Sequence, residues 1–267
     1  LIRHSARVGF SLQECLVGEE DGEIIASCLC VDAPGRTGNV FIPSSVRLER
    51  AEEAMTDLLT AVAEHARRRG LTLLQAIIET TSEHEATIYS QAGYERLARL
   101  LYYERDLRAE LPEITRPEDV SWVTYGDDRH ELFAQVVAGT YEGSRDCARL
   151  NGLRDIDDIL AGHRATGSFD PKHWLIMKVG DAAVGVILLA DIPERSSWDL
   201  VYMGVLPAFR GAGWAQVLLR KAVLMGRQRA TTAMTLTVDE SNAPARRLYH
   251  QFGFSQSLAR DAWFRLL

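Results

Sequence analysis

The chain has 267 residues, of which 46% are hydrophobic and 25% are charged, and its formal net charge is −7. This composition is typical of a globular protein and excludes a chain that is disordered throughout. The negative charge gives no general basic field for nucleic acid, and the longest apolar stretch, VGVILLA at 184–190, is far shorter than the roughly 20 residues that span a bilayer. We therefore expect neither a nucleic-acid partner nor a membrane partner.

The sequence begins LIRHSARVGF at Leu1, and this stretch lacks the apolar core of a secretion signal. We expect a cytoplasmic protein whose first domain is truncated at its N-terminus. Cys28 and Cys30 are two apart in a strand-like run, which places both on one face, with no matching CxxC motif or His pair to complete a metal site. The pattern predicts structural thiols and no bound metal.

Hydrophobic periodicity in the first half predicts alternating strands and helices. A hairpin is expected to turn at Asp21-Gly22 within LQECLVGEEDGEIIASCLCV, and NVFIP is the next strand. A helix is predicted over 52–69, followed by a strand LLQAIIE, a short helix through IYSQAG and a closing strand ARLLYYERDL. The segment RAELPEITRPEDV carries Pro112 and Pro117 among charges and has no apolar period, which predicts a linker.

The second half predicts a strand SWVTY, helices over 128–141 and 156–163, and three adjacent strands HWLIMKV, DAAVGVILLA and WDLVYMGV. A long helix, a strand MTLTV, a shorter helix and a last strand AWFRLL follow. The spacing of apolar residues in the long helix predicts one buried face, formed by Ala215, Leu218, Leu219, Ala222 and Val223.

The two halves repeat one pattern. LYHQFGF at 248–254 corresponds to IYSQAGY at 88–94, so that Tyr89 and Tyr249 are 160 positions apart. The same offset places Leu58-Leu59 on Leu218-Leu219 and Glu79 on Asp239, and it holds for about forty positions without a gap. A fixed offset of this kind indicates a duplicated domain.

A glycine-containing turn joins a strand to the long helix in the second half, at RGAGWA over 210–215. Such a turn exposes unpaired backbone N–H groups in front of the positive end of the helix dipole, which favours a phosphate or pyrophosphate. A side chain at Gly211 or Gly213 would hold a phosphate oxygen away from these donors. The GxGxxG fingerprint fails because its third glycine is Gln216, and the P-loop lysine is missing.

RGAGWA fits R-x-x-G-x-A and resembles the coenzyme A loop of the GNAT superfamily of acyl-CoA N-acyltransferases. The resemblance continues from Asn242 through Ala245 and Tyr249 to Gly253-Phe254, which match the family's N-x-x-A-x-x-x-Y-x-x-x-G-F pattern. It implies an α/β fold of two tandem GNAT-like domains, each with a mixed, mostly antiparallel central sheet flanked by helices. We expect a first domain over 1–107, a linker over 108–118 and an acetyl-CoA-binding domain over 119–267.

The first domain is expected to be degenerate. At the 160 offset, Gly211-Ala212-Gly213 falls on Ala51-Glu52-Glu53, and Asn242 falls on Ser82. Carboxylates in place of a phosphate loop repel pyrophosphate, by about 1 to 4 kcal/mol for each like-charge pair at about 4 Å. Tandem arrangements with one working half occur in the family, for example in mycothiol synthase.

The resemblance implies acetyl transfer from acetyl-CoA to a primary amine by direct attack, with no metal. It suggests Tyr249 as the acid for the leaving thiolate, although the copy at Tyr89 leaves a purely structural packing role open. Asp199 is a candidate base, and Asp191 and Glu194 are reserve candidates. The alternative is that Asp199 is a solvated turn residue and that water acts as the base. The implied cofactor-binding residues are Met203, Val205, Arg210, Gly211, Ala212, Gly213, Trp214, Ala215 and Asn242.

The acceptor is expected to be a small molecule that binds near the 141–147 loop and, by hypothesis, against the first domain. Glu142, Arg145 and Asp146 in this loop either meet a polar acceptor or are simply solvated, and no residue is assigned there. A thiol-sugar or aminoacyl acceptor is a further possibility within the enzyme hypothesis. The rival hypothesis is a non-catalytic module that senses acyl-CoA or binds a protein partner. The sequence does not predict an oligomeric state.

Overall fold

The computed structural model describes residues 15–43, 49–114 and 119–267. The start of the chain at Leu1 and Pro117 of the predicted linker lie outside this part. The described chain falls into two compact units, Leu1–Ala98 with Arg260–Leu267, and Arg99–Ala259. Within the described residues, no helix has the length and apolar character needed to cross a membrane.

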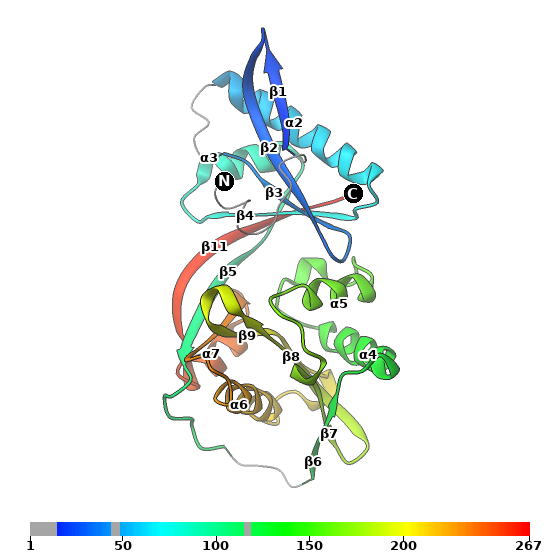
Figure 1. The fold of residues 1–267 in the computed structure, drawn as a ribbon, viewed down its shortest axis with the longest axis vertical. Coiled ribbons are helices and arrows are strands. Elements are labelled where there is room, and N and C mark those ends of the chain that lie inside the picture. The colour runs from blue at the N-terminus through cyan, green and yellow to red at the C-terminus, as the bar shows by residue number, and fades with distance from the viewer. Residues whose placement is uncertain (1–14, 44–48, 115–118) are drawn as a thin grey trace. The chain divides into compact units, whose positions relative to one another are not determined.

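The first unit contains a sheet with strand order β1-β2-β3-β4-β11 (Figure 1). The predicted hairpin is confirmed, since β1 and β2 are antiparallel and Asp21 and Gly22, both with positive φ, form the turn. Cys28 and Cys30 are both buried, as expected for structural thiols. Its elements are β1 (Cys15–Glu20), β2 (Glu23–Ala33), β3 (Thr37–Phe41), α2 (Glu49–Arg68), β4 (Leu73–Glu79), α3 (Glu83–Gln91) and the ends of β5 (Glu95–Asp106) and β11 (Ser255–Leu266).

The second unit has strand order β5-β10-β9-β8-β7-β6. One face packs on α6, where four of the five residues of the predicted buried face are fully buried and the fifth, Ala215, is half-buried; the other face packs on α4. The four are Leu218, Leu219, Ala222 and Val223. Among the strand pairs whose register the structure gives, β3–β4 and β9–β10 are the parallel ones, so the sheet arrangement is mixed and mostly antiparallel, as predicted. The elements are β6 (Val120–Thr124), α4 (His130–Tyr141), α5 (Ile156–Arg164), β7 (Trp174–Val179), β8 (Ala182–Ile192), β9 (Ser197–Val205), α6 (Trp214–Gly226), β10 (Ala233–Asp239) and α7 (Ala243–Gln251).

The repeat is confirmed at the level of element boundaries. Three consecutive elements of the first half, β4, α3 and β5, have bounds that lie 160 positions before those of β10, α7 and β11. The parallel pairs agree as well, because Thr37↔Leu73 corresponds to Ser197↔Ala233. The two halves are therefore copies of one fold.

The closing strands of the two copies are exchanged. β10 pairs with β5, with Asp239 opposite Leu100, and β4 pairs with β11, with Glu79 opposite Arg260. The two registers are equivalent under the 160 offset. The last strand of the first copy, β5, therefore pairs with β10 of the second copy, and the last strand of the second copy, β11, pairs with β4 of the first copy. Residues 99–106 consequently belong to the second unit and residues 260–267 to the first, which differs from the predicted boundaries at 107 and 119.

The exchange makes a testable prediction about stability. Deleting residues 260–267 is expected to weaken the first unit, because β4 loses its antiparallel partner and the Arg265 bond to the Ala92 carbonyl (2.6 Å) disappears. Hydrogen–deuterium exchange should then show faster exchange in β3 and β4, with β8 and β9 unchanged. Leu258→Ala, in the exposed part of β11, is the matched control. Unchanged protection of β4 in the deletion variant would disprove the exchange.

Candidate functional site

The parallel pairing of β9 with β10 ends at Leu200↔Leu236. At this point β9 also has a bulge against β8, because Leu189 faces Leu200 while Leu188 faces Tyr202, which leaves Val201 as the extra residue. The bulge changes which way the strand's side chains face: Leu200 belongs to the core beside α6, and Tyr202 packs with the core beside α4. Residues 202–205 thus pair with β8 alone among the described strands.

The backbone of Met203 and Val205 faces the unpaired side of β9. Leu206 donates its N–H to the Val184 carbonyl of β8 at 2.9 Å, and backbone groups alternate in direction along a strand. The N–H and C=O groups at positions 203 and 205 therefore point away from β8. The Val205 carbonyl is already occupied by Arg210 Nε at 3.0 Å, which leaves the Val205 N–H and both Met203 groups for a ligand that adds like a strand.

The glycine loop leads directly into α6. Gly211 and Gly213 have φ of 80° and 83°, in the left-handed region that favours glycine, and Gly213 is the N-cap residue of the helix. A Cβ at Gly211 would meet nothing within 4 Å. No described residue accepts a well-formed hydrogen bond from the N–H of Gly211, Ala212 or Gly213, and the first turn of α6 has no acidic residue. The loop fits a phosphate group bound by backbone donors.

The neighbouring predicted residues have structural contacts. The Arg210 guanidinium donates to the Val205 and Thr140 carbonyls at 3.0 and 2.9 Å, so it braces the loop against β9 and α4. Trp214 and Ala215 are half-buried in the first turn of α6 and pack against the core. Asn242 caps α7, since its Oδ1 accepts from the Ala245 N–H at 3.3 Å.

Tyr249 and its copy Tyr89 differ in the use of the hydroxyl group. Tyr89 is buried and donates to the Val40 carbonyl at 3.2 Å. The Tyr249 side chain is 7% exposed, and its hydroxyl makes no hydrogen bond to any residue that the structure describes. Burial, followed by the nearby Asp146 carboxylate and Tyr202, raises the pKa of Tyr249, so the phenol keeps its proton at neutral pH.

Asp199 lies in the paired part of β9, before the bulge. Its Oδ1 accepts from Thr235 Oγ1 of β10 at 2.6 Å, and burial raises the pKa of its carboxyl. The first copy has an equivalent contact at the same offset, where Gln75 Nε2 donates to Asn39 Oδ1 at 2.7 Å. Because the degenerate copy retains this cross-strand pair, the contact of Asp199 is a feature of the fold. The structure does not bring Asp199 into contact with Tyr249.

The sequence did not identify Asp146 as a site residue. Its Oδ1 accepts from the Asp239 N–H at 2.9 Å, and Asp239 Oδ2 in turn accepts from the Cys147 N–H at 3.1 Å. The Asn242 side chain opposes the rise that burial causes in the pKa of the Asp146 carboxyl. Cys147 has a left-handed φ of 45°, an unfavourable conformation for a residue other than glycine. The 142–155 connection is thus held against the ends of β10 and α7.

Three rings from α4, α5 and β9, those of Tyr141, His163 and Tyr202, contact one another. Tyr202 hydrogen-bonds Thr140 through its hydroxyl at 2.8 Å and stacks on the His163 ring at a centroid distance of 5.2 Å. The Tyr141 hydroxyl lies 3.2 Å from His163 Nε2. Burial lowers the pKa of His163 to about 4 and raises that of Tyr202 to about 12, and it raises the pKa of Tyr141 as well. All three rings are therefore uncharged at neutral pH.

In the first unit, the positions equivalent to the glycine loop are helical. α2 begins at Glu49, so residues 51–53 lie in its first turns. Glu52 forms an ion pair with His84 Nδ1 of α3 at 3.0 Å, and Glu53 is exposed. Ser82 has the backbone angles of Asn242 but makes no side-chain cap. These replacements agree with a degenerate first copy.

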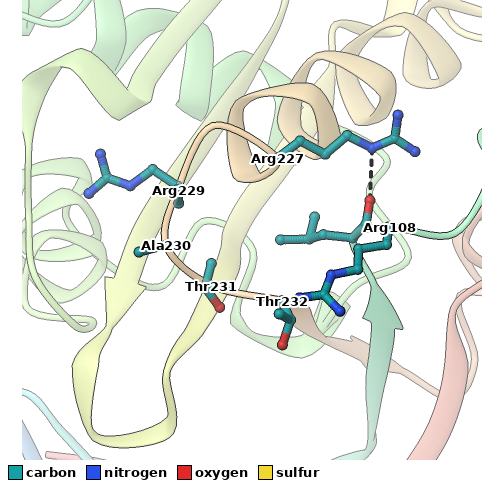
Figure 2. Close-up of a pocket in the computed structure, with 7 residues that line it drawn as sticks. Arg108, Arg227, Arg229, Ala230, Thr231 and Thr232 are labelled. Atoms are coloured by element: carbon teal, nitrogen blue, oxygen red, sulfur yellow. Dashed lines mark hydrogen bonds between the residues drawn. The ribbon is translucent and has the colours of Figure 1, made fainter.

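A pocket of about 500 Å³ lies at the other end of α6 (Figure 2). It is about 20 Å from the glycine loop, judged from the 13 residues of the helix. Its arginines have partners: Arg227 donates to the Leu107 and Ala109 carbonyls, and Arg229 pairs with Asp191. Asp191, a reserve candidate for the base, therefore belongs to this end of the unit. The lining residues are Leu107, Arg108, Arg227, Arg229, Ala230, Thr231 and Thr232.

Comparisons with known proteins agree with this description. The profile of the Acetyltransferase (GNAT) family matches residues 140–254, which lie within the second unit. A mycothiol acetyltransferase from Thermomonospora curvata is 28% identical over 245 residues, covering 90% of this chain and 78% of that protein.

Two solved structures share the fold. A GCN5-related N-acetyltransferase from Sphaerobacter thermophilus has a TM-score of 0.67 at 19% identity, covering 99% of this chain and 85% of that chain. A tandem GNAT protein from the clavulanic acid biosynthesis pathway has a TM-score of 0.51 at 15% identity, covering 99% and 86%.

The mixed sheet, the unpaired edge of β9 and the glycine loop agree with an acyl-CoA-dependent transferase. The chain matches the GNAT family of acetyltransferases over residues 140–254 and shares the fold of a tandem GNAT protein. It is an N-acetyltransferase with acetyl-CoA as its co-substrate.

Proposed function

We propose that the second unit transfers the acetyl group of acetyl-CoA to a primary amine of a small-molecule acceptor by direct attack. The observation that carries the proposal is the difference between the two copies. Within the described residues, only the second copy has a glycine loop with free backbone donors and a tyrosine whose hydroxyl has no partner. The first copy has acidic residues at the loop positions and a tyrosine that is bonded to Val40.

The roles follow from these contacts. The loop over 210–215 binds the pyrophosphate through backbone N–H groups, and the free edge at Met203 and Val205 binds the pantetheine arm. The amine nitrogen attacks the thioester carbonyl carbon, the C–S bond breaks, and the departing sulfur receives a proton from Tyr249. Arg210 and Asn242 keep the loop and α7 in place for this reaction.

The name of the relative from Thermomonospora curvata favours one subclass of acceptors. That protein is a mycothiol acetyltransferase, so a thiol-bearing metabolite with a free amino group is a second, narrower candidate for this chain. Acetylation of such a thiol-bearing metabolite and acetylation of any other primary amine follow the same reaction.

An acceptor screen tests the proposal. Purified full-length protein, acetyl-CoA and individual amines are incubated, and mass spectrometry follows the mass of each amine together with the release of free CoA. The panel contains glucosamine, tyramine, spermidine, lysine and a glucosamine carrying a cysteinyl thiol. Acetylated amine formed in proportion to free CoA supports the proposal. Tight binding of acetyl-CoA without any acetylated amine would instead support the sensing module.

A further inference from the structure

Strand β5 lies beside α7, the helix that carries Tyr249, although by sequence β5 is the closing strand of the first copy. Leu101, Tyr103 and Arg105 alternate along β5, and all three are buried. Tyr103 pairs with Leu236 of β10 and belongs to the same core cluster as Tyr249. The exchange of closing strands therefore brings side chains of the first copy to the helix of the proposed acid.

Tyr103 contacts two consecutive residues of α7. Its hydroxyl hydrogen-bonds His250 Nε2 at 3.2 Å, and the two rings meet edge to face with their centroids 5.3 Å apart. The Tyr103 ring also lies against the Tyr249 ring, with centroids 6.3 Å apart and an angle of 49° between the ring planes. Both contacts act at the last turn of the helix, so they oppose a rotation of α7 about its axis.

The polar contact is specific to the second unit. At the 160 offset, the residues that correspond to Tyr103 and His250 are Trp263 and Ser90. Trp263 Nε1 is buried and has no hydrogen-bond partner among the described residues. The unit that lacks the glycine loop therefore also lacks the hydrogen bond between the closing strand and the short helix.

Another contact of the closing strand occurs in both units and is a feature of the fold. A Cβ at Gly253, just after α7, would lie 3.0 Å from Arg105 Nη1. A Cβ at Gly93, just after α3, would lie 3.6 Å from Arg265 Cζ, at the equivalent place. Both units thus keep an arginine of the closing strand at the end of the short helix. The bond made by Tyr103 is the contact that distinguishes the second unit.

The second unit needs an anchor for its tyrosine that leaves the hydroxyl free. In the first unit, the Tyr89 hydroxyl itself fixes the ring by donating to the Val40 carbonyl. A hydroxyl that delivers a proton to sulfur cannot be held in this way. A rotation of α7 by about 10° moves the Tyr249 hydroxyl by roughly 1 Å, because that hydroxyl lies well outside the helix axis. A misplacement of about 1 Å can cost roughly 100-fold in rate.

We propose that Tyr103 is a positioning residue for the acetyl transfer. Its hydrogen bond to His250 fixes the rotation of α7 and thereby aims the Tyr249 hydroxyl at the departing sulfur. This inference rests on the proposed function, and it gives the first copy a part in the catalysis of the second unit. Tyr103 transfers no proton itself and acts through the two residues of α7 that it contacts.

Removing the Tyr103 hydroxyl tests the inference. Tyr103→Phe keeps the ring in the core and is expected to lower kcat about tenfold for the amine that the wild type acetylates fastest. The KM for acetyl-CoA should change less than about twofold, because Arg210 still braces the glycine loop against β9 and α4. The loss of one hydrogen bond should lower the melting temperature by only about 2–4 °C.

The Tyr249→Phe background separates positioning from a general structural effect. Because Tyr103 acts through the Tyr249 hydroxyl, adding Tyr103→Phe to Tyr249→Phe should lower kcat by less than about twofold. His250→Ala removes the same bond from the other side, so its effect on kcat should not add to that of Tyr103→Phe. Tyr89→Phe is the matched control: it loses one buried hydroxyl bond in the first unit and should keep the wild-type kcat.

Two kinetic results would overturn the inference. The first is a Tyr103→Phe enzyme that keeps more than about half of the wild-type kcat. The second is a further loss of about tenfold when Tyr103→Phe is added to Tyr249→Phe, because the effect then does not pass through the Tyr249 hydroxyl. A wild type that binds acetyl-CoA but acetylates no amine overturns the proposed function instead.

Hydrogen–deuterium exchange of the full chain provides a readout that needs no acceptor. Loss of the Tyr103 hydroxyl should speed amide exchange in α7 by about threefold or more and leave exchange in β8 unchanged. Unchanged exchange in α7 overturns the inference even when no acceptor is known.

Discussion

Replacing Gly213 with glutamate is expected to abolish measurable acetyl-CoA binding. Gly213 has a φ of 83°, so a side chain there costs about 1–2 kcal/mol in backbone strain. A carboxylate at the helix N-terminus also repels the pyrophosphate by about 1–4 kcal/mol per charge pair. Together these effects predict a loss of affinity of roughly 100-fold or more in calorimetric titration.

Two control variants separate the causes of that loss. Gly213→Ala adds the strain without the charge and should weaken binding by only about tenfold. Glu53→Gln, at the corresponding place in the first copy, removes an exposed carboxylate from α2 and should leave the affinity unchanged. Similar losses in Gly213→Glu and Glu53→Gln would show that the glycine loop is not the binding site.

Tyr249→Phe is expected to lower kcat by roughly 100- to 10,000-fold, the range associated with loss of a general acid. The affinity for acetyl-CoA should change little, because the ring remains in the core and only the hydroxyl, which has no partner among the described residues, is removed. Rapid-quench kinetics with saturating acetyl-CoA measures the effect. Because burial raises the pKa of Tyr249 above its ordinary value, the wild-type kcat should show no decline between pH 7 and about 10 from ionisation of this phenol.

Tyr89→Phe is the matched control and should behave in the opposite way. It removes the hydrogen bond to the Val40 carbonyl, which costs about 1 kcal/mol of stability and about 2–4 °C in melting temperature. Its kcat should equal that of the wild type. Full activity in Tyr249→Phe would rule out the tyrosine as the acid and would favour the packing role that its copy at Tyr89 has.

Much of the fold could be predicted because local pattern and local structure agree. The strand LLQAIIE coincides with β4 from Leu73 to Glu79, and the buried stripe of α6 has the predicted leucines, Leu218 and Leu219. The exchange of closing strands could not be predicted, because β5 and β11 are copies with the same pattern. By its sequence pattern, either β5 or β11 could pair with either β4 or β10. Only long-range packing selects the observed pairs β10–β5 and β4–β11.

The candidate site was predictable where it depends on short motifs and unpredictable where it depends on contacts across the chain. RGAGWA and Asn242 are found by spacing, and both begin helices as expected. Asp146 lies in a connection without periodicity, and its partner Asp239 is 93 residues away. The bulge at Val201 is also invisible in sequence, since the apolar run through β9 continues across it.

The stoichiometry of acetyl-CoA binding tests the central claim most directly. Native mass spectrometry of the full chain with excess acetyl-CoA should show one bound molecule per chain, and none in the Gly213→Glu variant. Two molecules per chain, or one molecule that remains bound in Gly213→Glu, would contradict a single working site in the second unit.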